Sequence, residues 1–326
     1  MRKIQAKNIE LIDAVIGERA SGSISPALLE KDIHVTDALL AISKIKHDHT
    51  SLIFCGGTSL SKAHHIIERM SEDLDMKVVI SDDAALKDSE QRKHLSALKT
   101  KVIETMTSLG FVEDAEKRIA FNENKYFHSR WNYDPAYKYH GSLRPFLSIE
   151  FTTRTPIYET VNKPIGYLID KLAEQSSSTT NLECVSIEET MAEKVVSFLR
   201  RYSQNRAGEM KQPWDSALVR HIYDIYCIHN QDSQAVNQAS KNFKKLIDID
   251  IKEFGRQYPA FENNPMEIMS DALYKSAIDD KCIAEYNKYL LPLVFGEIRP
   301  TYEEAFESFK VCSERLISSY YPRPGR

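Results

Sequence analysis

The sequence predicts an α+β fold in which the strands lie in the first half of the chain and helices fill the second half. Three observations predict this fold. A strand, a Gly-Gly turn, a helix and a second strand follow one another between Ser51 and Ser81. Further strand-like segments occupy residues 111–153. From Ile187 onward, apolar residues recur at the three- and four-residue spacing of helices.

Two helices are expected before the first strand, between Asn8 and Ile45, because apolar residues recur there every three or four positions. The pattern breaks between Ser21 and Ser25, where Gly and Ser gather just before Pro26. Ser25 is suited to cap the second helix, with Pro26 at its first position.

The first strand is the apolar run Ser51 to Cys55, which ends on Gly56-Gly57. A helix is expected from about Ser59 to Arg69. A second strand is expected from Glu72 to Ser81, where apolar residues first alternate with polar ones and then run together. This segment is therefore predicted to form a strand, a glycine turn, a helix and a second strand.

A charged helix is expected from about Ser89 to Leu109, with Gly110 as its C-cap. The aromatic-rich segment Phe111 to Tyr139 predicts the strands of a meander. Leu143 to Thr153 predicts a further strand, which carries Glu150 in its middle. The first half of the chain thus supplies all the predicted strands.

The Ser/Thr cluster Ser176 to Thr180 marks a boundary between a first domain, residues 1–178, and a helical domain, residues 179–326. The helices expected in the second domain are Ile187–Tyr202, Ser216–His229 and several weaker ones up to Tyr320. The tail after Tyr320 is expected to be disordered.

The bulk composition sets limits on the class of protein. A chain of 326 residues is long enough for two domains. Its net charge of −4 gives no overall basic field, so a polyanionic partner must be bound by a local patch. The five cysteines lack metal-ligand spacing and are interpreted as reduced thiols. Since neither a signal-peptide core nor a membrane-spanning apolar run is present, we expect a cytoplasmic protein without membrane contact.

The Gly56-Gly57 turn is suited to bind an anion. Without a Cβ atom, the two glycines permit a tight turn whose backbone N–H groups point outward at the start of the next helix. Thr58 and Ser59 add hydroxyl donors. Because neither the P-loop nor the dinucleotide-binding pattern is present, a plain strand-to-helix turn is the alternative.

Asp73 and Asp75 stand two residues apart in the second strand and therefore share one face. Two carboxylates this close repel each other unless a cation lies between them, and Mg²⁺ suits such a pair. A third carboxylate on a neighbouring strand completes a two-metal site, and Glu150 is the best candidate by position. The alternative is a solvated acidic turn before a strand.

Residues 56–62, Gly-Gly-Thr-Ser-Leu-Ser-Lys, and residues 68–75, which end on the two acids, closely resemble the AbiEii/AbiGii toxin family. This family belongs to the DNA polymerase β-like nucleotidyltransferase superfamily. Upstream, residues 28–36 resemble its helical lead-in. Downstream, residues 192–194 and 220–226 resemble its two later motifs, so the resemblance spans residues 28–228.

The resemblance implies a nucleotidyltransferase domain with a mixed sheet flanked by helices, followed by a helical domain that completes the active-site cleft. It implies that the turn holds the triphosphate of an NTP, that two acids bind Mg²⁺, and that a lysine and an aspartate of the helical domain are essential. The residues concerned are Gly56, Gly57, Thr58 and Ser59, then Asp73 and Asp75, then Lys194 and Asp224.

The roles of three residues each have an alternative interpretation. Lys62 is a further candidate for a phosphate contact, and a solvated lysine is its alternative. Asp224 orients Lys194 or assists in activating the acceptor hydroxyl. His221 is interpreted as a neutral packed residue rather than a general base.

Two further groups of residues are candidates for RNA binding. The basic stretch is interpreted either as a face that meets an RNA backbone or as an ordinary solvated surface; it comprises Lys194, Arg200, Arg201, Arg206 and Lys211. The aromatic residues between Tyr126 and Tyr139 are interpreted as core and sheet residues rather than base-stacking partners.

We therefore expect a toxin of a toxin–antitoxin or phage-defence pair that transfers a nucleoside monophosphate from an NTP and releases pyrophosphate. The acceptor is a hydroxyl of RNA, with the tRNA 3′ end as one candidate, or of protein. A cognate antitoxin protein is the expected partner. The alternatives are an inactive nucleotide-binding or partner-binding module, and a phosphotransferase on the same fold.

Overall fold

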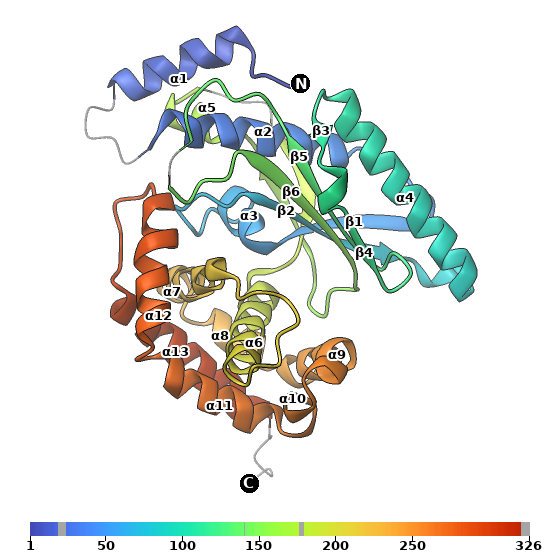
Figure 1. Ribbon diagram of the computed structural model, residues 1–326, viewed down its shortest axis with the longest axis vertical. Coiled ribbons are helices and arrows are strands. Elements are labelled where there is room, and N and C mark those ends of the chain that lie inside the picture. The colour runs from blue at the N-terminus through green and yellow to red at the C-terminus, as the bar shows by residue number, and fades with distance from the viewer. Residues whose placement is uncertain (19–23, 140, 176–178, 321–326) are drawn as a thin grey trace. The chain divides into compact units, whose positions relative to one another are not determined.

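The computed structural model describes residues 1–18, 24–139, 141–175 and 179–320. The chain forms two compact units (Figure 1). The first, here the sheet unit, comprises Met1–Pro156 and Thr160–Val185; the second, the helical unit, comprises Ile157–Glu159 and Ser186–Arg326. Part of the expected boundary, residues 176–178, and the tail 321–326 lie outside the described residues.

The sheet unit contains one mixed sheet with the strand order β3-β5-β6-β2-β1-β8-β7, and β4 pairs with β5. At its centre β2 runs antiparallel to β1 and parallel to β6. The mixed sheet and the helical second part confirm the predicted fold class. The strands are β1 Thr50–Cys55, β2 Asp73–Ile80, β3 Val112–Glu113, β4 Ile119–Phe121, β5 Tyr126–Asn132, β6 Phe146–Thr153, β7 Val161–Ile165 and β8 Thr180–Cys184.

The two faces of the central strands differ in chemistry because successive side chains alternate between them. One face is apolar and buried; on β2 and β6 it carries Leu74, Met76, Val78, Leu147, Ile149 and Phe151. The opposite face is polar; on the same strands it carries Asp73, Asp75, Lys77, Ser148, Glu150 and Thr152. The core therefore lies on one side of these strands, and the other side is available for chemistry.

Two strands, β7 at the edge of the sheet and β8 next to it, were not predicted from the sequence. β7 pairs with β8, which joins β1 and so extends the sheet on that side. β7 carries Pro164, which cannot donate a ladder hydrogen bond and is confined to edge positions of sheets. Because β7 is short and contains a proline, the alternation of apolar and polar residues did not indicate a strand there.

Among the described residues of the sheet unit, five helices accompany the sheet: α1 Ala6–Glu18, α2 Pro26–Ile42, α3 Gly56–Lys62, α4 Asp88–Ser108 and α5 Leu168–Leu172. The Ser25 hydroxyl accepts the Leu28 N–H at 3.3 Å and Pro26 begins α2, which confirms the predicted cap. Gly110 follows α4 with φ +85°, the left-handed conformation of a helix C-cap glycine. The break between the two helices was expected from Ser21 to Ser25, and its residues 21–23 lie outside the described part.

The helix after the glycine turn is shorter than predicted. It ends at Lys62 rather than Arg69 because His65 adopts φ +54° and the Ile66 N–H donates to the Leu60 carbonyl at 2.9 Å. A left-handed residue after a helix end is usually glycine, and here it is a histidine. The two adjacent histidines, His64 and His65, consequently lie beyond the helix and not on it.

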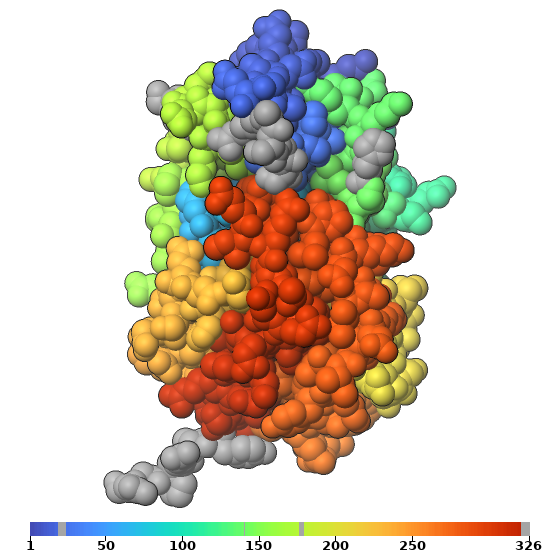
Figure 2. All heavy atoms as spheres, turned by 90° about the vertical axis from the view of Figure 1, so that its left-hand side faces the viewer, coloured from blue at the N-terminus to red at the C-terminus, as the bar shows by residue number. Residues whose placement is uncertain are grey.

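The helical unit is built around α6 Ile187–Arg206, which contacts α7, α8, α9, α11 and α13. Phe198 stacks on Tyr202 and meets Phe309 of α13 edge to face at 5.2 Å. Figure 2 shows that the C-terminal helices, in orange and red, lie next to one another on the visible face of this unit. The other helices are α7 Arg220–Gln231, α8 Ala235–Ser240, α9 Phe243–Phe254, α10 Pro259–Asn263, α11 Pro265–Ser276, α12 Asp280–Glu285 and α13 Tyr302–Tyr320.

Within the described part of the chain, no helix has the combination of length and apolar character that crossing a bilayer requires.

Candidate active site

The two predicted acids lie on the polar face of β2. Asp73 and Asp75 are both half-buried and project to the same side, as their spacing predicted. β2 lies between β1 and β6, so Asp75 faces Cys55 on one side and Glu150 on the other. The strand therefore places both carboxylates in the middle of the sheet.

Glu150 pairs in register with Asp75 across the parallel strands β2 and β6. Neighbouring strands are about 4.8 Å apart, so the two side chains leave the sheet side by side. Tyr126 lies on the next strand, β5, and its hydroxyl donates a hydrogen bond of 2.9 Å to Glu150 Oε2. Among the residues that the structure describes, no group of three or more His, Cys, Asp or Glu side chains is arranged to hold a metal ion.

Gly56 is required by the position of Asp75. A Cβ atom at Gly56 would lie 2.0 Å from Asp75 Oδ2, and the residue has φ +76°, which side chains rarely adopt. At Gly57 a Cβ atom would lie 2.7 Å from Ser71 Oγ and 3.0 Å from Arg69 Nη2. The two glycines thus let the segment carrying the acids approach the start of α3.

Thr58 and Ser59 follow in the first turn of α3 and are buried. The Thr58 hydroxyl donates to the Asp73 carbonyl oxygen and so ties α3 to β2. In this conformation the Thr58 hydroxyl is engaged within the fold, and the contact of Thr58 and Ser59 with a triphosphate stays a prediction.

Lys62 is buried in an ion pair. Its ammonium group donates to Asp32 Oδ1 and to Thr36 Oγ1, both at 2.6 Å. Asp32 also accepts the Leu168 N–H at 2.8 Å. The alternative of a solvated lysine is therefore wrong, and because the ammonium is engaged with α2 we leave Lys62 out of the proposed phosphate contacts.

We expect Lys62→Met to lower the free energy of unfolding by about 3–5 kcal/mol, because it leaves the buried Asp32 carboxylate without its cation. Urea denaturation measures this loss. Lys62→Met/Asp32→Asn should recover part of it. Lys244→Met removes an exposed lysine paired with Asp248 and should cost less than about 1 kcal/mol. Equal costs for the two lysines would contradict a structural role for the Lys62 pair.

Arg144, which the sequence analysis did not single out, holds Asp73. Its Nη2 atom lies 2.8 Å from both Asp73 carboxylate oxygens. Its backbone N–H and its Nε donate to Glu72 at 2.6 and 3.3 Å. Burial opposes the charged form, but Asp73 and Glu72 outweigh it and raise the pKa of Arg144 above its ordinary value. Arg144 therefore fixes the entry of β2 through two consecutive acids.

Lys31 of α2 completes this charge network. Its ammonium donates to the Arg144 carbonyl oxygen at 2.8 Å and lies 4.0 Å from Glu72 Oε1, with both side chains fully buried. Burial, opposed by the Glu72 carboxylate and reinforced by the Arg144 guanidinium, lowers the pKa of Lys31 to about 8. Two cations and two acids therefore meet where β2 begins.

Lys31 should make stability depend on pH. Its pKa is about 8 in the folded protein and 10.5 ordinarily, so between these values the unfolded chain binds the extra proton. The free energy of unfolding should then rise with pH by up to about 1.4 kcal/mol per unit from this group. Urea denaturation of the parent protein and Lys31→Met from pH 7 to 10 tests this. Curves that stay parallel above pH 8 would contradict the lowered pKa.

In the helical unit, Lys194 of α6 and Asp224 of α7 form a buried ion pair of 2.9 Å. This contact is the one that the predicted orienting role of Asp224 requires, and the role itself stays a prediction. The Nδ1 atom of His221 lies 3.2 Å from the Lys194 carbonyl oxygen. Because a carbonyl only accepts, Nδ1 carries the proton in this contact, as fits the packed histidine that was expected.

The basic stretch does not form one surface. Arg200 is buried in an ion pair of 2.7 Å with Asp250 and lies over the Phe254 ring. Arg201 pairs with Asp215 at 3.3 Å, and Arg206 with Asp279 at 3.4 Å. Both earlier interpretations are therefore wrong for Arg200, which packs between α6 and α9.

Most of the aromatic residues between 126 and 139 pack in the fold. Phe127, Trp131 and Tyr133 are buried, which confirms the interpretation as core residues. Tyr126 differs, because it lies on the polar face and its hydroxyl meets Glu150.

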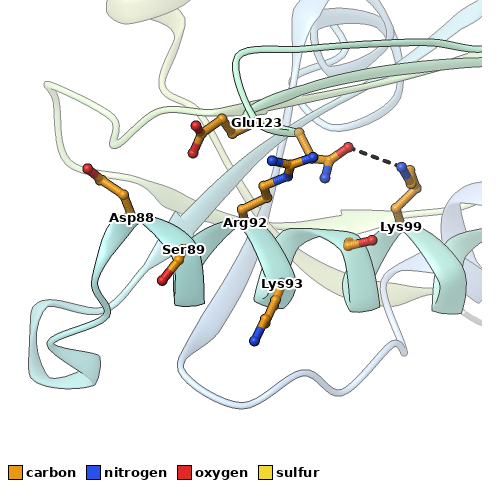
Figure 3. Close-up of a pocket in the computed structure, with 8 residues that line it drawn as sticks. Asp88, Ser89, Arg92, Lys93, Lys99 and Glu123 are labelled. Carbon is orange, nitrogen blue, oxygen red and sulfur yellow. Dashed lines mark hydrogen bonds between the residues drawn. The ribbon is translucent and has the colours of Figure 1, made fainter.

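A cavity of about 690 Å³ lies between α4 and the turn that joins β4 to β5 (Figure 3). Arg92 and Lys99 point toward this turn, and Lys99 Nζ donates to Asn124 Oδ1 at 3.0 Å. Asp88 and Glu123 face the same space, so its charge is mixed. None of the predicted site residues lines this cavity.

The comparisons with known proteins agree with the predicted family. A family profile described as "Nucleotidyl transferase AbiEii toxin, Type IV TA system" matches residues 38–308. A comparison with curated proteins gives no match. Similar solved structures include MenT4, a nucleotidyltransferase toxin from Mycobacterium tuberculosis H37Rv, and JHP933 from Helicobacter pylori.

The likeness to these structures is distant. MenT4 is 18% identical, with 69% of this chain and 76% of that chain covered and a TM-score of 0.38. JHP933 is 14% identical, with 89% of this chain and 94% of that chain covered and a TM-score of 0.40. At these values the structural likeness carries no argument about function.

The profile match covers residues 38–308, most of the chain, and so defines its class as a nucleotidyltransferase. The chain belongs to the AbiEii family of nucleotidyltransferase toxins from type IV toxin–antitoxin systems. The match runs to residue 308, beyond the resemblance to residue 228 that the sequence motifs indicated, so most of the helical unit belongs to the family.

Proposed function

We propose that this toxin transfers a nucleoside monophosphate from an NTP to a hydroxyl group of an RNA or protein, releases pyrophosphate, and is countered by a cognate antitoxin. The observation that carries the proposal is the register of Asp75 with Glu150, two residues from Asp73, on the polar face of the sheet. Transfer of this kind needs positioning and charge stabilisation more than covalent chemistry from the protein.

The residues present fit Mg²⁺ by their chemistry. Asp73, Asp75 and Glu150 offer carboxylate oxygens on adjacent positions of neighbouring strands, which are the ligands that Mg²⁺ prefers. Bound there, the ion would supply Lewis-acid stabilisation of charge on the phosphate oxygens. Since Arg144 contacts both oxygens of Asp73, ligation by Asp73 requires that this guanidinium shift or share the carboxylate.

The other proposed residues position the nucleotide. The backbone at Gly56 and Gly57 begins a helix and is suited to an anionic triphosphate. Lys194 carries a compact positive charge suited to a phosphate, and a phosphate contact requires that its ammonium group be shared with the buried Asp224 carboxylate.

Incubation of the full chain and MgCl₂ with α- or γ-labelled NTPs, cellular RNA and cellular protein tests the proposal. The expected result is α-label on a macromolecule together with released pyrophosphate. Label transferred only from the γ position would replace the proposal with a phosphotransferase. Nucleotide binding without any transfer would indicate a binding module.

A further inference from the structure

An exposed aromatic pair lies on the hairpin formed by β4 and β5. Phe121 ends β4 and Tyr126 begins β5, and their rings stack with centroids 5.7 Å apart and an interplanar angle of 20°. Phe121 is 56% exposed, which makes it one of the most exposed large apolar residues of the described chain. One side of its ring is covered by Tyr126, and much of the rest is open to solvent.

This pair lies on the polar face, beside the proposed catalytic acids. Phe121 pairs with Tyr126, and Tyr126 pairs with Thr152 of β6, so all three side chains leave the sheet on the same face as Glu150. The Tyr126 hydroxyl donates to Glu150 Oε2 at 2.9 Å. Phe121 is two strand spacings, or about 10 Å, from the strand that carries Glu150.

The turn between the two rings is held in an unusual conformation. Asn122, Glu123 and Asn124 all have positive φ, at 48°, 58° and 68°. Such a conformation costs free energy in residues other than glycine and persists where surrounding contacts fix it. The Lys125 N–H donates to the Asn122 carbonyl at 3.0 Å, and Lys99 holds the Asn124 side chain. These contacts fix the two rings at the base of the turn.

We propose that Phe121 and Tyr126 form a stacking platform for a nucleobase, a role that rests on the proposed nucleotidyl transfer. A flat, uncharged ring fits this place, because the neighbouring carboxylates repel an anionic group but not a base. Stacking on an aromatic side chain tolerates any base, since each has a π face. The base belongs either to the NTP or to an unpaired end of the acceptor RNA.

Binding measurements on the full chain separate these two sources. The ligands are NTP analogues with a methylene bridge between the α- and β-phosphorus atoms, a short single-stranded oligoribonucleotide, and inorganic tripolyphosphate, which has no base. Phe121→Ala should weaken binding of one base-containing ligand by roughly 5- to 150-fold and leave tripolyphosphate binding unchanged. Weaker NTP-analogue binding assigns the platform to the NTP, and weaker oligoribonucleotide binding assigns it to the acceptor.

Three further variants keep the test specific. Phe121→Trp should retain binding because it keeps the aromatic face, whereas Phe121→Leu should not. Tyr274→Ala removes an aromatic residue that is 62% exposed in the helical unit and should change nothing. If Phe121→Ala binds both base-containing ligands with unchanged affinity, the stacking platform is overturned and the proposed function is not affected. If the parent protein binds neither NTP analogue nor tripolyphosphate, the proposed function is overturned as well.

Discussion

Asp75→Asn is expected to lower nucleotidyl transfer by about 1000-fold or more while the protein stays folded. Asp75 lies between β1 and β6 and pairs in register with Glu150. The amide keeps the shape of the side chain but removes the negative charge that would bind a divalent cation. Loss of such a charge from a metal-dependent transfer corresponds to several kcal/mol of transition-state stabilisation. Transfer of α-label at saturating NTP and MgCl₂ measures the effect.

The controls separate chemistry from folding. Asp271→Asn removes the carboxylate of an exposed ion pair on α11 and should leave transfer unchanged. Urea denaturation should show Asp75→Asn within about 1 kcal/mol of the parent protein, since the carboxylate is half-buried rather than enclosed. A folded Asp75→Asn protein that transfers label at the parental rate would remove Asp75 from the proposed mechanism.

The features that sequence reasoning predicted depend on residues close together in the chain. Asp73 and Asp75 share a face because strand side chains alternate, and this needs no tertiary information. Ser25 and Pro26 begin α2 for the same local reason. The pairing of Lys194 with Asp224 was raised because both occupy motifs of one family. Local spacing and motifs thus indicated most of the candidate site.

The features that were missed depend on the order of strands and on contacts distant in the chain. Glu150 was predicted on a neighbouring strand, but its register with Asp75 follows from the parallel pairing of β2 and β6, which alternation cannot reveal. Arg144 lies just before β6, and only the folded sheet places it against Asp73. Lys62 is buried because Asp32 comes from α2. The early end of α3 depends on a left-handed histidine, where a glycine would have been a readable signal.

We expect Gly56→Ala to abolish transfer. The accompanying loss of unfolding free energy is too small to explain the loss of transfer. Two effects act at this residue. The positive φ of +76° costs about 1–2 kcal/mol in any residue with a side chain. In addition, the new methyl group would lie 2.0 Å from Asp75 Oδ2, so the carboxylate must turn away from its position beside Glu150. Transfer should then fall about as far as in Asp75→Asn, as the same α-label assay measures.

Gly208 supplies the matched control because it has φ +72° with no atom within 4 Å of the position a Cβ would take. Gly208→Ala should therefore lose a similar 1–2 kcal/mol of unfolding free energy and retain full transfer. If both alanine variants lose transfer alike, backbone strain and not the position of Asp75 is responsible. If Gly56→Ala alone loses it, the glycine turn acts through the acid. The role of Gly56 is then to leave room for the Asp75 carboxylate, which the fold places against the start of α3. This role is separate from any contact that the backbone of Gly56 makes with phosphate.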